Sequence, residues 1–340
     1  MKRYLLYISQ NYSYQILRPL QQLIRERGDD AAWFLEGDEV NPAYLRADER
    51  RLASIGAVRA YQPDVVLVPG PMVPGFIPGL KVEVFHGFDA GKPGHFVLRG
   101  CFDLYCTQGP NTTRPFQALV DKTPYARVIE TGWPALDTLF HMAPPAEPNP
   151  RPTVLLCSTF SRRFTGAPHL LSTVERLRLD DRWQWLVQFH PKMDPEVVRQ
   201  YQALENTNLR FIETDDIQPL LHRADLMVCD NSSVLLMFLL LNKPVVTFRN
   251  TQPGPHLIDI REPQQLAGAI EEGLARPPHL MEAIRAFNAE LHPYNDGRSS
   301  ERVLAAVDAV LAGQFPVTRK KPLNLRRNFK ARRKLNYWKP

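Results

Sequence analysis

Short apolar runs alternate with amphipathic stretches along most of the chain, which is the pattern of α/β proteins. In the first half the apolar runs lack strict polar–apolar alternation, as expected for strands buried on both faces of a parallel sheet. Residues 14–27 instead repeat their apolar positions at helical spacing and predict an amphipathic helix. Strands are predicted at 4–9, 31–35, 64–68, 82–85, 103–107 and 127–131.

A proline-rich segment interrupts this pattern at 141–152, where five prolines stand among few apolar residues. Such a composition predicts a linker. After it the alternation resumes, with strands predicted at 153–157, 183–189, 209–212, 225–229 and 244–248. Helices are predicted at 168–177, 217–223 and 299–311, and others starting at Asp194, Ser232, Pro263 and Pro278.

Two successive series of strands and helices predict an α/β protein with two Rossmann-like, doubly wound parallel-sheet domains facing across a cleft. The expected boundaries are 1–140 for the first domain, 141–152 for the linker, 153–313 for the second domain and 314–340 for a tail. Ligands bind beyond the carboxyl ends of the strands in such sheets. Polar residues that directly follow a strand are therefore the candidates for function.

Composition agrees with a globular protein, since 44% of residues are hydrophobic and 23% are charged. The longest apolar run, 234–241, is far shorter than the ~20 residues that a membrane-spanning helix needs. The N-terminus lacks the features of a signal peptide, so we expect a cytoplasmic location. The four cysteines show no C-x-x-C spacing and are expected to be buried structural thiols rather than zinc ligands or disulfides.

The positive charge is concentrated at the C-terminus. The whole chain carries a net charge of +6, yet ten lysines and arginines and no acidic residue fall within 319–339. Removing these ten from the 42 basic residues leaves 32 against 36 acidic ones, a net charge of −4. The body is mildly acidic, and the tail carries the whole positive excess.

His86 and Gly87 follow the predicted strand 82–85, and Lys92 and His95 lie in the same loop. A histidine here could act as a general base, because the ordinary pKa of ~6.5 is close to working pH. It could equally be a loop histidine bonded to backbone. At the end of the strand 183–189, His190 and Lys192 could face an anion, or Pro191 could simply form a turn there.

Asp230-Asn231-Ser232-Ser233 follows a strand and precedes an apolar helix. A helix N-terminus with adjacent hydroxyls suits a phosphate or diphosphate. Plain helix capping by Asp230 or a serine is the alternative. Thr159 and Arg162 follow the first strand of the second half and are candidate phosphate or ribose contacts, with solvated surface the alternative.

Several motifs are absent from the sequence. It has no G-x-x-x-x-G-K-[ST] loop, no G-x-G-x-x-G fingerprint and no G-x-S-x-G elbow, which argues against an NTPase, a dinucleotide dehydrogenase or an α/β-hydrolase. An Asp-x-Asp pair at a strand end, suited to a divalent ion, is also missing. We therefore expect no cofactor and no metal, and charge stabilisation by helix dipoles, histidine and lysine.

Taken in order, the motifs at the strand ends resemble the CDP-glycerol glycerophosphotransferase family, the teichoic-acid-type polyol phosphate transferases of the GT-B fold. The resemblance spans about 86–302, roughly two thirds of the chain. The sequence departs from the family's pattern in two places: Leu236-Met237 replaces a Phe-Asp pair, and Ser158 replaces a proline. The matching motifs are His86-Gly87 with Lys92, Gly132-Trp133-Pro134-x-x-Asp137, Ser158-Thr159-Phe160, His190-Pro191, Ala224-Asp225-Leu226, Asp230-x-Ser232-Ser233, Lys243-Pro244-Val245-Val246 and Asp296-Gly297-Arg298-x-x-Glu301-Arg302.

The resemblance implies that glycerol phosphate, or a related polyol phosphate, passes from a CDP-activated donor to a hydroxyl of a cell-surface glycan precursor, with release of CMP. His86 would deprotonate the acceptor hydroxyl. His190, Ser232 and Ser233 would hold the donor diphosphate, assisted by Lys92 or Lys192. Other enzymes of similar fold remain alternatives, namely nucleotide-sugar glycosyltransferases and UDP-sugar 2-epimerases, as does a non-catalytic membrane scaffold.

The tail 315–340 interleaves its cations with Leu323, Leu325, Phe329, Leu335, Tyr337 and Trp338. Such segments bind anionic membrane surfaces, so we expect a peripheral location on the inner face of the cell membrane and a glycan or lipid-linked acceptor. A disordered solubilising tail is the main alternative. We do not expect nucleic acid as a partner, because the folded body is acidic and no nucleic-acid-binding module accompanies the tail.

Overall fold

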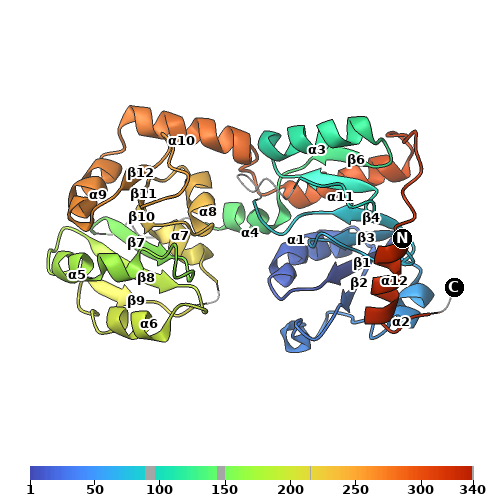
Figure 1. The fold of residues 1–340 in the computed structure, drawn as a ribbon, viewed down its shortest axis with the longest axis horizontal. Helices are drawn as coiled ribbons and strands as arrows, with labels where there is room; N and C mark the ends of the chain where they lie inside the picture. Colours follow the sequence, from blue (N-terminus) through green and yellow to red (C-terminus); the bar gives the residue numbers. More distant parts are fainter. Residues whose placement is uncertain (89–95, 144–149, 215, 339–340) are drawn as a thin grey trace. The chain divides into compact units, whose positions relative to one another are not determined.

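A computed structural model describes residues 1–88, 96–143, 150–214 and 216–338. The chain forms two compact units. The first contains Met1–His141 together with Glu290–Pro340, and the second contains Met142–Ala289. Each unit is built on a six-stranded sheet (Figure 1).

The sheet of the first unit is entirely parallel, with the strand order β2-β1-β3-β4-β5-β6. Its central strands are almost fully buried, which explains their uninterrupted apolar sequences. All six predicted strands of this half are confirmed. They are β1 (Arg3–Ile8), β2 (Asp30–Leu35), β3 (Val65–Val68), β4 (Leu80–Glu83), β5 (Leu104–Thr107) and β6 (Arg127–Glu130).

Helices pack on this sheet through apolar stripes. One hydrophobic cluster joins alternate residues of the strands to α2 (Ile55–Tyr61) and α3 (Pro110–Lys122). The predicted helix 14–27 is α1 (Ser13–Glu26), which contacts β1, β2 and α11 (Ser299–Leu311). The short helix α4 (Asp137–His141) follows β6.

The second unit has the parallel strand order β12-β11-β10-β7-β8-β9. The predicted strands are confirmed, and a short edge strand, β12, is added to them. Helices α5 (Ala167–Leu177), α6 (Pro195–Gln202) and α9 (Leu266–Leu274) surround one cluster of the core. The strands are β7 (Thr153–Ser158), β8 (Gln184–Phe189), β9 (Leu209–Phe211), β10 (Leu226–Cys229), β11 (Val245–Phe248) and β12 (Ile258–Ile260).

The units divide the chain differently from the predicted domains. The predicted second domain ran to residue 313, but the division falls inside α10 (Pro278–Leu291), between Ala289 and Glu290. α11 belongs to the first unit because it packs on α1 and β5, and because Asp137 accepts hydrogen bonds from the backbone amides of Ser299 (2.8 Å) and Ser300 (2.7 Å). Half of the predicted linker, 144–149, lies outside the described residues.

The C-terminal segment 315–338, which we call the C-terminal arm, is folded against the first unit (Figure 1). It contains the helix α12 (Leu325–Lys334), and its Leu335 and Tyr337 pack against the core of that unit. Tyr337 stacks on Phe76 with ring centroids 5.5 Å apart. The alternative of a disordered tail is therefore wrong, because these apolar side chains anchor the arm.

Within the described ranges, no helix is both long enough and apolar enough to cross a bilayer. All four cysteines are buried with free thiols, and burial raises the pKa of each. They contribute to the core as small apolar side chains.

Candidate functional site

The sheet orders locate a topological switch point in each unit, which is where ligands bind in doubly wound sheets. In the second unit the switch lies between β7 and β10, whose pairing runs from Leu226 opposite Val154 to Val228 opposite Leu156. In the first unit it lies between β1 and β3. The candidate residues at 158–162 and 230–233 follow β7 and β10, so the structure brings these two segments together.

Asp230 organises the switch point of the second unit. It is almost completely buried and accepts hydrogen bonds from the Ser158 hydroxyl and from the backbone amides of Thr159 (3.0 Å), Gly166 (2.8 Å) and Ser232 (3.1 Å). Burial raises the pKa of Asp230, and these hydrogen bonds oppose that rise. Asp230 thus fixes the loops after β7 and β10 against each other.

Ser232 and Ser233 immediately precede α8 (Val234–Leu240), so that this helix begins two residues later than predicted. Ser233 is the N-cap residue, but its side chain makes no capping hydrogen bond. Ser232 is half-buried and Ser233 is exposed. Among the described residues, neither hydroxyl has a hydrogen-bond partner, so both are available to a ligand.

His190 stands at the end of β8 in an aromatic setting. Its ring lies 4.6 Å from the ring of Phe160, and its Nδ1 accepts a hydrogen bond from the Lys192 amide at 3.0 Å. The neutral ring therefore carries its proton on Nε2, which can donate outward. Burial, and then the Lys192 ammonium, lower the pKa of His190.

Thr159 and Arg162 lie beside this group in the loop after β7. The Thr159 amide is bonded to Asp230, while its hydroxyl accepts only a long hydrogen bond, 3.5 Å, from the Ser161 amide. The Arg162 side chain is 90% exposed and forms an ion pair with Asp194 at 3.3 Å. Arg162 is thus at the surface of the loop that carries Phe160.

In the first unit, His86 follows β4 and lines a pocket of about 410 Å³ with Ser9, Gln10 and Arg99. The ring of Tyr12 lies 5.9 Å from the His86 ring. His86 is half-buried, so one side of the imidazole is open to the pocket. The predicted partners Lys92 and His95 lie outside the described residues.

The loop that carries His86 is held by residues that follow other strands. Phe85 has a φ of 59°, a left-handed conformation that a bulky residue adopts only where its surroundings impose it. The Trp133 indole donates to the Phe85 carbonyl at 3.2 Å, and Gln108 donates to the Gly87 carbonyl at 2.7 Å. Both neighbours of His86 are therefore fixed.

Trp133 is itself held by a buried histidine, because its amide donates to Nε2 of His292 at 2.9 Å. Burial, followed by the charge of Arg302, lowers the pKa of His292 to about 4. The preceding Gly132 has a φ of 81°, and a Cβ there would lie 2.5 Å from the Ser299 hydroxyl. The Gly-Trp-Pro motif thus requires glycine and connects α11 to the His86 loop.

A protein-family model, CDP-Glycerol:Poly(glycerophosphate) glycerophosphotransferase, matches residues 105–309. The chain belongs to this family.

Membership makes the chain an enzyme of the CDP-glycerol glycerophosphotransferase type and confirms the resemblance seen in the sequence. No curated protein sequence matches the chain significantly.

Solved structures show that the fold is of the GT-B type. A protein of Listeria monocytogenes assigned as a UDP-N-acetylglucosamine 2-epimerase is 15% identical, covers 95% of this chain and 100% of its own, and has a TM-score of 0.68. The wall teichoic acid polymerase TagF, as a variant soaked with CDPG, is 15% identical over 93% of this chain and 90% of its own, with a TM-score of 0.64. The UDP-GlcNAc 2-epimerase of Neisseria meningitidis bound to UDP-GlcNAc is 14% identical over 90% and 99%, with a TM-score of 0.64.

Several motif residues of this glycerophosphotransferase make contacts that stabilise the fold. The Lys243 ammonium donates to three carbonyls at the end of α7 (Gln218–Arg223) and just beyond it, at 2.6–2.9 Å. Asp225 accepts from the Thr153 amide at 2.8 Å, and Asp296 pairs with Arg302 at 2.5 Å. That ion pair is the main reason why the pKa of Asp296 is lowered to about 2.

Sequence reasoning missed the residues that support the candidates. Phe160 was noted only as part of a motif, yet its ring lies 4.6 Å from the His190 ring and 6.0 Å from the Lys192 ammonium. Tyr12 and Gln108 were not among the candidates, although they too follow strands of the first sheet. Gln108 stands directly after β5, and Tyr12 lies in the segment between β1 and α1; these positions were the signal that could have identified them.

No group of three or more His, Cys, Asp or Glu side chains placed to hold a metal ion occurs in the part of the chain that the structure describes.

Proposed function

We propose that this enzyme transfers glycerol phosphate, or a related polyol phosphate, from a CDP-activated donor to a hydroxyl of a cell-surface glycan precursor. The family match carries the proposal. The strand ends of the second unit support it, because His190 and Lys192 follow β8, and the two serines that follow β10 have hydroxyls without a hydrogen-bond partner among the described residues. These groups suit a diphosphate, which accepts hydrogen bonds and carries negative charge.

In the proposed reaction His86 accepts the proton of the acceptor hydroxyl. The resulting oxygen attacks the phosphorus distal to cytidine, a new P–O bond forms, and the bond to the oxygen of CMP breaks. CMP departs with the added negative charge. His190, Ser232 and Ser233 would donate to the diphosphate, with Lys192, Thr159 and Arg162 around it. Such positioning and charge stabilisation account for most of the catalysis in phosphoryl transfer.

We further propose that the enzyme works at an anionic membrane surface through the C-terminal arm. Leu323, Leu325, Phe329 and Trp338 of the arm are each more than half exposed. Phe329 and Trp338 form an aromatic pair at 5.5 Å, and the exposed Arg326 and Arg333 lie on the same helix as Phe329. Apolar and cationic groups presented together favour binding to anionic lipid.

An epimerase acting on a UDP-sugar is the second candidate, because UDP-GlcNAc 2-epimerases share the fold. Thermal unfolding with a panel of CDP-glycerol, CDP-ribitol, UDP-sugars and CMP-sugars separates the two, since a ligand that binds only the folded state raises the unfolding temperature. We expect stabilisation by the CDP-polyols. Stabilisation by UDP-N-acetylglucosamine alone would reject the CDP-polyol donor.

The serines provide a test within the same panel. Replacing Ser232 and Ser233 by alanine removes two donors to the diphosphate, and each hydrogen bond to a charged group contributes about 1.5–3 kcal/mol. We expect the double variant to lose most of the stabilisation by CDP-glycerol. Ser172→Ala, an exposed serine on α5, is the control. A double variant stabilised as strongly as the unmodified protein would remove the serines from the donor site.

A further inference from the structure

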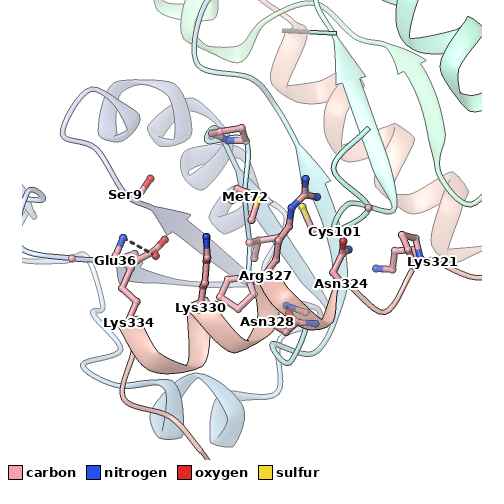
Figure 2. Close-up of a pocket in the computed structure, with 18 of the residues that line it drawn as sticks. Ser9, Glu36, Met72, Cys101, Lys321, Asn324, Arg327, Asn328, Lys330 and Lys334 are labelled. Atoms are coloured by element: carbon pink, nitrogen blue, oxygen red, sulfur yellow. Dashed lines mark hydrogen bonds and ion pairs between the residues drawn. The ribbon is translucent and has the colours of Figure 1, made fainter. Parts of the chain in front are cut away.

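A second pocket lies beside the one that contains His86. It has a volume of about 980 Å³ and is enclosed between the strand ends of the first unit and the C-terminal arm (Figure 2). Both pockets are lined by Ser9 and Gln10, which follow β1, and by Pro71, which follows β3. The two pockets therefore adjoin at the switch point of this unit.

The arm also connects the two pockets. Arg327 of α12 lines the large pocket and donates to the carbonyl of Arg99, which lines the His86 pocket. Asn328 accepts from the Gly75 amide at 2.8 Å, and Lys321 pairs with Asp103 at 2.8 Å. These contacts fix the arm as a wall of the large pocket.

Cationic side chains from one side of α12 line the pocket at that wall. Arg327, Lys330 and Lys334 are spaced by three and four residues, so that they share one helix face, and Figure 2 shows them rising from α12 on the same side. Lys334 pairs with Glu36 at 3.0 Å. Lys330 makes no hydrogen bond or ion pair with any described residue, so its ammonium is available to a ligand.

The remaining lining is mixed. Met72, Val73 and Cys101 supply apolar surface, while Glu36, Asp38 and Glu39 supply carboxylates near the ends of β1 and β2. Carboxylates accept hydrogen bonds from hydroxyls, and lysine and arginine bind phosphate. The volume is at the upper end of small-ligand pockets, far more than one phosphate ion needs. The lining fits an elongated molecule that carries both hydroxyls and phosphates.

The family name gives poly(glycerophosphate) as the family's acceptor. We propose that this pocket is the acceptor site of the present enzyme, and that Lys330 of the C-terminal arm contacts a phosphate of the acceptor chain. The proposal rests on the transfer reaction proposed above. It assigns to the arm a role in substrate binding, through the helix face opposite its exposed apolar residues. The terminal hydroxyl of such a chain would extend from the large pocket into the adjoining pocket, towards His86.

The test measures binding without any donor, so that its failure is distinct from a failure of the transfer reaction. A synthetic trimer of glycerol phosphate is titrated into the full-length protein by calorimetry, alongside triglycerol, which lacks phosphate, and inorganic phosphate. The trimer should bind at least about tenfold more tightly than either. Equal binding of inorganic phosphate would reduce the pocket to a simple anion site and overturn the proposal.

Lys330→Glu should weaken binding of the trimer about tenfold or more, because it replaces an ammonium group that binds phosphate by a carboxylate that repels it. Lys320→Glu makes the same change on the same arm, at an exposed residue that lines neither pocket, and should leave binding unaltered. Trimer binding that is equal in Lys330→Glu and the unmodified protein would overturn the proposal.

Anionic vesicles of phosphatidylglycerol distinguish a lipid headgroup from a free acceptor. Loss of vesicle binding in Lys330→Glu with unchanged trimer binding would assign the lysine to the membrane surface and also overturn the proposal. In turnover assays with CDP-glycerol, Lys330→Glu should raise the KM for the acceptor and leave the KM for the donor unchanged.

Discussion

At the scale of single residues, the candidate site depends on side chains that orient other side chains. Trp133 and Gln108 fix the backbone on either side of His86, and Asp230 fixes the loops around Ser232. The sequence predicted which residues follow strands, because buried parallel strands appear as plain apolar runs. It could not separate ligand-facing residues from supporting ones, since both are polar and both follow strands.

His86 is the residue on which the proposed chemistry most depends. His86→Ala should lower the rate of CMP release about 10²–10⁴-fold, the range that a general base contributes, with little change in stability. His279→Ala, an exposed histidine on α10, is the control and should retain full activity. Turnover in His86→Ala close to that of the control would show that another group removes the proton.

The lowered pKa of His292 predicts that the free energy of unfolding depends on pH. Its pKa in the folded protein, about 4, is below the ordinary value of ~6.5, so between these values the unfolded chain binds more protons. The stability that His292 contributes is therefore present above pH ~6.5 and is lost as the pH falls towards 4, by an amount on the order of 3 kcal/mol.

The comparison for His292 is His292→Gln, whose side chain can still accept from the Trp133 amide but does not titrate. Its stability, from urea unfolding at a series of pH values, should fall less steeply between pH ~6.5 and 4 than that of the unmodified protein. Parallel curves would mean that His292 is not responsible for the loss.

At the scale of elements, strands were predicted more accurately than helices. The edge strand β12 was missed, and α2 and α3 were not predicted. α12 was unforeseen because its residues are mostly cationic, and isolated helices of this length are marginal in water. It is stabilised instead by contacts of Leu335, Tyr337 and Arg332 with the first unit, including Arg332 over Phe76 at 4.7 Å.

The exposed aromatic pair of the C-terminal arm, Phe329 and Trp338, is predicted to contribute to membrane binding. Replacing Phe329 and Trp338 by alanine should weaken co-sedimentation with phosphatidylglycerol vesicles by about tenfold, since each buried aromatic contributes ~1.5–3 kcal/mol and insertion at the interface is partial. Leu179→Ala, an apolar residue that is 70% exposed in the second unit, is the matched control. Vesicle binding unaffected by the double substitution would exclude this surface.

At the scale of the whole molecule, the chain returns to its first unit after completing the second. Neither periodicity nor composition marks this return, because the sequence of α11 predicts only another amphipathic helix, like those of the second half. The hydrogen bonds from Ser299 and Ser300 to Asp137 reveal it, and they join residues more than 160 positions apart. The two-sheet α/β architecture was predictable from the pattern of strands, whereas the boundary between the units was not.

The central claim is a transfer of polyol phosphate, and its most direct test is the product. Full-length enzyme is incubated with CDP-glycerol and a glycerol phosphate oligomer, and both products are followed by mass spectrometry. The account predicts one CMP released for each glycerol phosphate added to the oligomer. CDP-glycerol that remains intact while UDP-N-acetylglucosamine is epimerised by the same preparation would contradict it.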